Sequence, residues 1–149
     1  MSIAATLKIN DSIRTKTFEM NGHTFKVKVP LGSELDAINK RVLSPTQEAI
    51  DARFEKMSAN LKDADIEGIE RKDGDIIIDG NSIKKTVTSV LQMETKITEY
   101  FKLLIPEEGS LAEITYEQID EEFPLQTQFE FLEKITEVIQ PNYKDARKN

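Results

Sequence analysis

The longest amphipathic stretch of the chain, residues 83–105, most constrains what this sequence can fold into. Its apolar residues recur every three or four positions, as they do on one face of an α-helix, and comprise Ile83, Val87, Val90, Ile97, Phe101 and Leu104. Pro106 cannot continue a helix because it has no backbone N–H, and Gly109 follows soon after. We therefore expect one long helix over 83–105 and a mainly helical fold around it.

A β-hairpin is predicted at about residues 14–30. Asn21-Gly22 suits a two-residue type I′ turn because both residues tolerate positive φ, and alternating apolar residues flank the pair. In that register Met20 faces His23 and Phe18 faces Phe25. One face of the hairpin is then apolar, and it comprises Phe18, Met20, Phe25, Val27 and Val29.

Two helices are expected directly after the hairpin, on the basis of their capping residues. Ser33 is predicted to cap a helix that ends near residue 43. Ser44 is predicted to cap the next helix, with Pro45 at the first helical position and Gln47 completing a capping box. Both helices carry an apolar stripe and should pack against the core.

The remaining elements follow from turn and capping signals. Asp73-Gly74 favours a second small hairpin, which would pair the region of Ile69 with residues 76–78. Thr115 with Gln118 predicts the capping box of a short helix, which ends near Phe123-Pro124 and is followed by a last helix up to residue 140.

The length and composition predict a single domain over residues 1–149. It would comprise the hairpin, a helical body at about 33–140 and a polar tail at 141–149, which makes the fold class mainly α, or α+β by strict count. No apolar run approaches the roughly 18 residues that a membrane-spanning helix needs, so no membrane contact is expected. With no Cys in the sequence, the cytoplasm is the simplest location.

The sequence shows no pattern of residues that is typical of a catalytic, cofactor-binding or metal-binding site. His23 is the only histidine, and no nucleophile motif accompanies it. The acidic stretch 63–74 begins with the spacing of a calcium loop, but Gly74 stands at the twelfth position, where a bidentate Glu should close the cage. We therefore expect no enzymatic activity, no cofactor and no metal.

The last helix and the long helix both carry more apolar side chains than one core stripe needs. On the last helix the expected core stripe comprises Leu125, Phe129, Leu132, Ile135 and Ile139, and Phe131 and Val138 lie beyond its edge. On the long helix Tyr100 flanks the stripe and Leu103 lies well outside it. We predict that Tyr100, Leu103, Phe131 and Val138 bind an apolar helical partner. Burial of the same four residues in a compact helical core remains the alternative.

The charge of the chain is uneven. The net charge is −7, and residues 107–137 hold ten Asp and Glu against the single base Lys134. This acidic region should repel nucleic acid and keep an exposed apolar surface dispersed in solution. It also supports a different function, that of an acidic decoy that mimics nucleic-acid charge and inhibits a basic partner.

The order of features resembles that of a known family. A hairpin "KTFEMNGHTFKVKVP" is followed by "LGSELDAINKRV", acidic helices, "EITYEQIDEEFPLQTQFEFLEKITEVI" and a polar tail. In this arrangement the chain resembles the tail assembly chaperones of long-tailed bacteriophages.

The resemblance implies a non-enzymatic protein of the host cytoplasm. Such a chaperone binds the tape measure protein, keeps it soluble during tail morphogenesis, helps gather tail tube protein around it, and leaves before the virion matures. We also expect a homo-oligomer. A structural tail or connector subunit is a further alternative.

Overall fold

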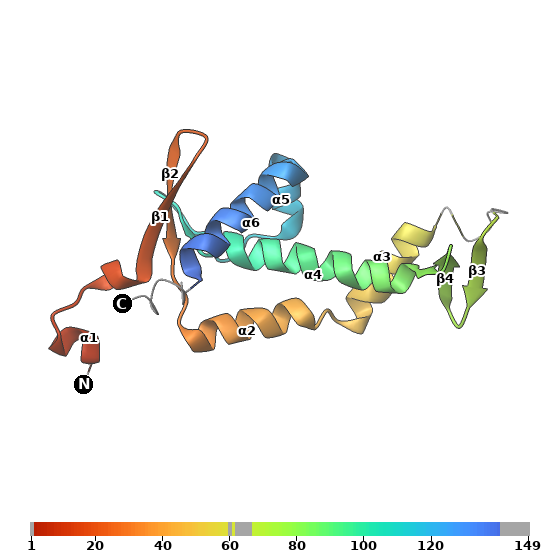
Figure 1. Cartoon of the computed structure of the whole chain (residues 1–149), viewed down its shortest axis with the longest axis horizontal. Coiled ribbons are helices and arrows are strands. Elements are labelled where there is room, and N and C mark those ends of the chain that lie inside the picture. Colours follow the sequence, from red (N-terminus) through yellow and green to blue (C-terminus); the bar gives the residue numbers. More distant parts are fainter. Residues whose placement is uncertain (1, 60, 62–66, 141–149) are drawn as a thin grey trace, which may run out of the picture. The chain divides into compact units, whose positions relative to one another are not determined.

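The computed structural model describes residues 2–59, 61 and 67–140, which form the mainly helical α+β fold that the sequence predicts (Figure 1). The chain groups into two units, one made of Met1–Asp36 with Ile97–Asn149 and the other of Ala37–Lys96. We call them unit 1 and unit 2. The single domain stays a prediction, because two such units can still unfold in one cooperative step. The predicted polar tail, 141–149, lies outside the described residues.

Unit 1 contains the predicted N-terminal hairpin. Strands β1 (Thr15–Met20) and β2 (His23–Lys28) pair in the expected register, with Met20 opposite His23 and Phe18 opposite Phe25. Asn21 and Gly22 have φ of 53° and 76°, as the type I′ turn requires. Phe18, Met20 and Val27 are buried, and Phe25 and Val29 are half-buried, which confirms the predicted apolar face.

Helix α4 (Ile83–Phe101) is shorter than predicted. The helix ends at Phe101, and the two residues that precede Pro106 form a short strand, β6 (Leu104–Ile105), which pairs with Lys26 and Val27 of β2. A residue before proline is biased toward extended backbone, and the open edge of β2 offers that backbone hydrogen-bond partners. The predicted helix over 83–105 is therefore wrong in its last turn.

The rest of unit 1 consists of short elements and the last helix. Helix α1 (Ile3–Thr6) and a 3-10 helix, η1 (Asp11–Arg14), precede β1. Helix α5 (Tyr116–Glu122) begins with the predicted capping box of Thr115 and Gln118. Helix α6 (Leu125–Ile139) follows Pro124 and packs against β1.

Two of the predicted helix starts are wrong. Helix α2 (Gly32–Leu43) already contains Ser33, and the Glu34 carboxylate accepts the Leu31 N–H at 2.8 Å instead. Helix α3 (Gln47–Ser58) is capped by Thr46 rather than Ser44, because the Thr46 hydroxyl accepts the Ala49 N–H at 3.1 Å. Ser44 and Pro45 lie before the helix.

Unit 2 holds a second small sheet between α3 and α4. Strands β3 (Ile69–Lys72) and β4 (Asp75–Ile78) form the predicted hairpin, with Ile69 opposite Ile78. A third strand, β5 (Asn81–Ser82), was not predicted. It is joined to β4 by Asp79-Gly80, which takes positive φ just as Asp73-Gly74 does.

A bidentate ion pair and a hydrogen-bonded carboxylate connect the elements of unit 2. The Arg53 guanidinium of α3 donates to both Glu94 oxygens of α4, at 2.7 and 2.8 Å. Asp75 accepts the Ser82 hydroxyl and the N–H groups of Ile76 and Lys84, so that it links β4, β5 and the start of α4. Over the described residues, no helix is both long and apolar enough to cross a membrane.

Candidate functional site

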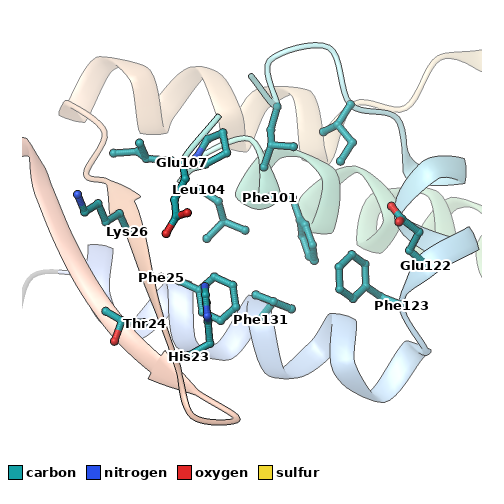
Figure 2. A pocket seen from close by; sticks show the side chains of 14 residues that line it. His23, Thr24, Phe25, Lys26, Phe101, Leu104, Glu107, Glu122, Phe123 and Phe131 are labelled. Atoms are coloured by element: carbon teal, nitrogen blue, oxygen red, sulfur yellow. The ribbon is translucent and has the colours of Figure 1, made fainter. Parts of the chain in front are cut away.

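Unit 1 contains an apolar pocket of about 630 Å³ (Figure 2). Its lining comes from β2, the end of α4, β6, the segment that leads to α5, the end of α5, and α6. We call it the aromatic pocket. A volume of this size is typical of protein sites that bind small molecules or a few side chains.

The pocket has a buried floor, half-buried walls and an exposed rim. The floor is formed by Phe101 and Phe131, which are 3% and 4% exposed. The walls include side chains that are half-buried, namely Phe25, Leu104, Leu111, Ile114 and Phe123. The rim carries exposed polar side chains, among them His23, Lys26, Glu107 and Glu122. A ligand would therefore meet apolar surface inside and charge at the mouth.

Phe131 is the centre of a cluster of phenylalanine rings that fixes the floor. Its ring centroid lies 5.0 Å from that of Phe101, 5.1 Å from Phe25, 5.6 Å from Phe123 and 6.3 Å from Phe18. These are the separations at which edge-to-face and tilted aromatic pairs attract each other. Five of the seven Phe of the sequence belong to this cluster, so it is the main packing feature of unit 1.

The local sequence around each phenylalanine explains why the rings of this cluster lie next to one another. Phe25 lies opposite Phe18 in the hairpin register, and their rings stack at 5.3 Å. Phe101 is the last residue of α4. Phe123 caps the C-terminus of α5 in extended backbone directly before Pro124, as expected of a residue that precedes proline.

Gln128 orients α6 against α5, a role that no sequence pattern indicated. Its side chain is fully buried, and its oxygen accepts the Tyr116 hydroxyl at 2.9 Å. Its amide nitrogen donates to the Phe123 carbonyl at 2.8 Å and to the Asp120 carboxylate at 3.2 Å. A buried amide that is satisfied in this way fixes which face of the helix turns inward.

The four residues predicted to bind a partner are not brought together at one surface. Tyr100 and Phe131 are only 6% and 4% exposed, so they belong to the core, whereas Leu103 and Val138 are half-buried. Burial also raises the pKa of the Tyr100 hydroxyl. Of the four, only Phe131 lines the aromatic pocket.

Two of the four positions have a physical explanation. On α6, the hairpin packs against the edge that carries Phe131, so this edge is buried. Leu103 lies after the end of α4, so the helical spacing that placed it outside the apolar stripe does not apply to it. Partner binding by Leu103 and Val138 stays a prediction.

The apolar surplus of α6 lies on the opposite edge from the one predicted. Leu125 and Phe129, which we expected in the core stripe, are 54% and 41% exposed. They stand one turn apart on the helix and form a small exposed apolar ridge. Neither residue lines the aromatic pocket.

The segment that lines one side of the pocket is rich in exposed acidic side chains. Of the ten Asp and Glu in residues 107–137, nine are exposed and Glu130 is half-buried. Residues 107–122 alone hold seven of them and no Lys or Arg. This segment includes the rim residues Glu107 and Glu122, so the pocket opens into a region of negative potential.

The lining offers apolar contact rather than reactive groups. His23 is exposed and packs its ring edge-on to Phe25 at 4.7 Å. In the part of the chain that the structure describes, no cluster of three or more His, Cys, Asp or Glu is arranged to hold a metal ion. Asp63 and Asp65, which begin the calcium-like spacing, lie outside the described residues.

Comparison of the chain with protein-family models, with curated proteins and with solved structures finds no match in any of the three.

Proposed function

We propose that this protein is a non-enzymatic tail assembly chaperone of a long-tailed bacteriophage, which acts in the host cytoplasm. It binds the tape measure protein, keeps it soluble during tail morphogenesis and helps gather tail tube protein around it. The observation that carries the proposal is the aromatic pocket, with its phenylalanine floor and its rim of charged side chains.

The chemistry of the pocket suits an apolar segment of a partner protein. Large apolar side chains of the partner would contact Phe101 and Phe131 and so be removed from water. This burial contributes about 25 cal/mol of binding free energy per Å² of apolar surface. The acidic surroundings would favour basic residues beside that segment, and they would keep the chaperone and its complexes apart from one another.

Co-expression with the tape measure protein tests the proposal. Leu111→Asp places a carboxylate in the pocket wall, in a segment without regular secondary structure, so the fold should tolerate it. Burying that charge against an apolar partner should weaken binding at least about tenfold. We expect the soluble fraction of the tape measure protein to fall to the level seen without the chaperone.

The matched control is Leu43→Asp. Leu43 is 67% exposed at the end of α2 and does not line the pocket, so the same chemical change should leave the tape measure protein soluble. Circular dichroism of both variants checks that the helices are intact. A tape measure protein that stays equally soluble with wild type and with Leu111→Asp would contradict the proposal.

The exposed acidic side chains favour a second candidate function, an acidic decoy that binds a basic partner. Salt separates the two functions in the same co-purification, since about 1 M salt shortens the Debye length to about 3 Å. A complex that depends on the aromatic pocket should persist at that salt concentration. A complex that depends on charge mimicry should dissociate.

A further inference from the structure

The first residues of the chain form an exposed apolar segment, which we call the N-terminal segment, residues 2–13. Four of its side chains are large and exposed: Ile3 by 79%, Leu7 by 63%, Ile13 by 56% and Ile9 by 38%. Its helix α1 is only four residues long, too short to be stable without packing. Apolar residues gathered in this way are typical of a segment that docks on another surface.

The segment joins the hairpin at its open end, whereas the aromatic pocket extends along β2 toward the turn. The segment enters the sheet at Thr15, opposite Lys28, and the pocket contacts β2 from His23 to Lys26. Along the strand, Lys26 lies about 7 Å and His23 about 17 Å from Lys28.

The segment and the pocket are also on different sides of β2. In the order β1-β2-β6, the segment continues from β1, and the pocket adjoins the β6 edge. Arg14 holds the end of the segment in place, because its guanidinium donates to the Glu34 carboxylate and to the Val29 carbonyl. The segment of a second copy can approach the pocket without crossing β2.

The charges of the segment and the pocket rim are complementary. Residues 2–16 hold three bases, Lys8, Arg14 and Lys16, and the single acid Asp11, whereas residues 107–122 hold seven acids and no base. Lys8 directly follows Leu7, so a segment whose apolar side chains enter the pocket brings this ammonium group to a rim that holds two carboxylates, Glu107 and Glu122, and one ammonium group, that of Lys26. Such complementarity favours docking of one copy on another in this orientation.

We propose that the N-terminal segment of one copy occupies the aromatic pocket of a second copy, with Ile3 and Leu7 as the anchoring side chains. The two stand four residues apart, so a helical turn presents them on the same side. The contact can be made reciprocally by two copies, which closes a twofold dimer, or repeated from copy to copy, which gives rings or open chains. The inference does not depend on the proposed function.

The oligomeric state of the full chain tests the inference. We expect the mass measured by sedimentation equilibrium to rise with concentration from that of a monomer to that of a dimer or a larger assembly. The double variant Ile3→Ser, Leu7→Ser should weaken association about 100-fold or more, because two apolar side chains are no longer buried in the pocket. Leu43→Ser, which removes an equally exposed apolar side chain from α2, should associate like wild type.

A cross-link identifies the surface that the segment occupies, and it does so even if the double variant misfolds. The chain has no Cys, so single cysteines report unambiguously. A mixture of Leu7→Cys and Glu122→Cys proteins should form a disulfide between the two chains. A mixture of Leu7→Cys and Glu137→Cys should not, because Glu137 is exposed on α6 but does not line the pocket.

Three results would overturn the inference. The first is a wild-type protein that stays monomeric throughout the concentration series. The second is association that the double variant leaves unchanged, and the third is cross-links that form equally with positions 122 and 137. None of the three bears on the tape measure protein, whose solubility is measured separately.

Discussion

Phe131 and Phe129 show at the residue scale how different two phenylalanines of one helix can be. The Phe131 ring contacts four other rings and is 4% exposed, whereas Phe129, two positions earlier, is 41% exposed. The difference arises because each residue of an α-helix is rotated by about 100° from the previous one, so two positions place the side chains on different sides of α6. Their contributions to stability should differ accordingly.

We predict that Phe131→Ala lowers the free energy of unfolding by about 3–5 kcal/mol, because it opens a cavity at the centre of the aromatic cluster. Phe129→Ala, the matched control, should lower it by no more than about 1 kcal/mol, since the ring is already partly in water. Urea unfolding followed by circular dichroism measures both. Equal losses for the two variants would contradict the packing described for α6.

The sequence predicts α6 well but does not predict its buried edge. Its apolar residues cover about half of the circumference, more than one neighbour can bury, so periodicity alone leaves two choices of face. Packing by β1 and the hydrogen bonds of Gln128 decide between them. A buried Gln reads as a surface residue until its partners are known, and periodicity alone does not show that the edge with Phe131 is the one that β1 covers.

The two hairpin turns are the elements whose sequences carried the most information, whereas two of the three predicted helix caps were wrong. Asn21-Gly22 and Asp73-Gly74 each predicted a hairpin and its register, because few other residues adopt positive φ. The end of α4 was harder to predict. Leu104 continues the helical spacing, but it pairs with β2, a strand distant in sequence. The spacing of nearby apolar residues carries no information about such a distant partner.

Asp75 is the residue through which the small sheet of unit 2 is joined to α4. Partial burial acts to raise the pKa of Asp75, but hydrogen bonds from the Ser82 hydroxyl and from the Lys84 and Ile76 N–H groups outweigh it and lower the pKa below 3.8. A carboxyl whose pKa is lower in the folded state stabilises the fold above its unfolded pKa. That stabilisation is lost as the pH falls through the folded pKa.

We predict that Asp75→Asn lowers the free energy of unfolding by about 1–2 kcal/mol at pH 7, because a neutral amide accepts these bonds less strongly. The difference in free energy of unfolding between wild type and Asp75→Asn should become smaller as the pH falls below about 5. Denaturation curves at a series of pH values measure it, with Asp73→Asn as the control for loss of an exposed carboxylate. If this difference in free energy of unfolding stayed constant down to pH 3, the ionised carboxylate of Asp75 could not be its cause.

At the scale of the whole molecule, an apolar pocket and an acidic surface occur in the same unit. Neither the pocket nor its floor could be predicted from sequence, because the lining comes from segments as distant as residues 23–26 and 131. The acidic region was predictable, since charge is a property of composition. One pocket cannot hold a tape measure segment and a neighbouring copy at once, so the two proposals imply competition between client and self-association.

Photo-cross-linking from the pocket tests the central claim most directly, namely that the aromatic pocket binds the tape measure protein. Benzoylphenylalanine would replace Phe123, a half-buried residue of the pocket wall, or Phe129 of the exposed ridge on α6. We predict cross-links to co-expressed tape measure protein from position 123 and few or none from position 129. Cross-links from position 129 alone, or from neither position, would contradict the claim.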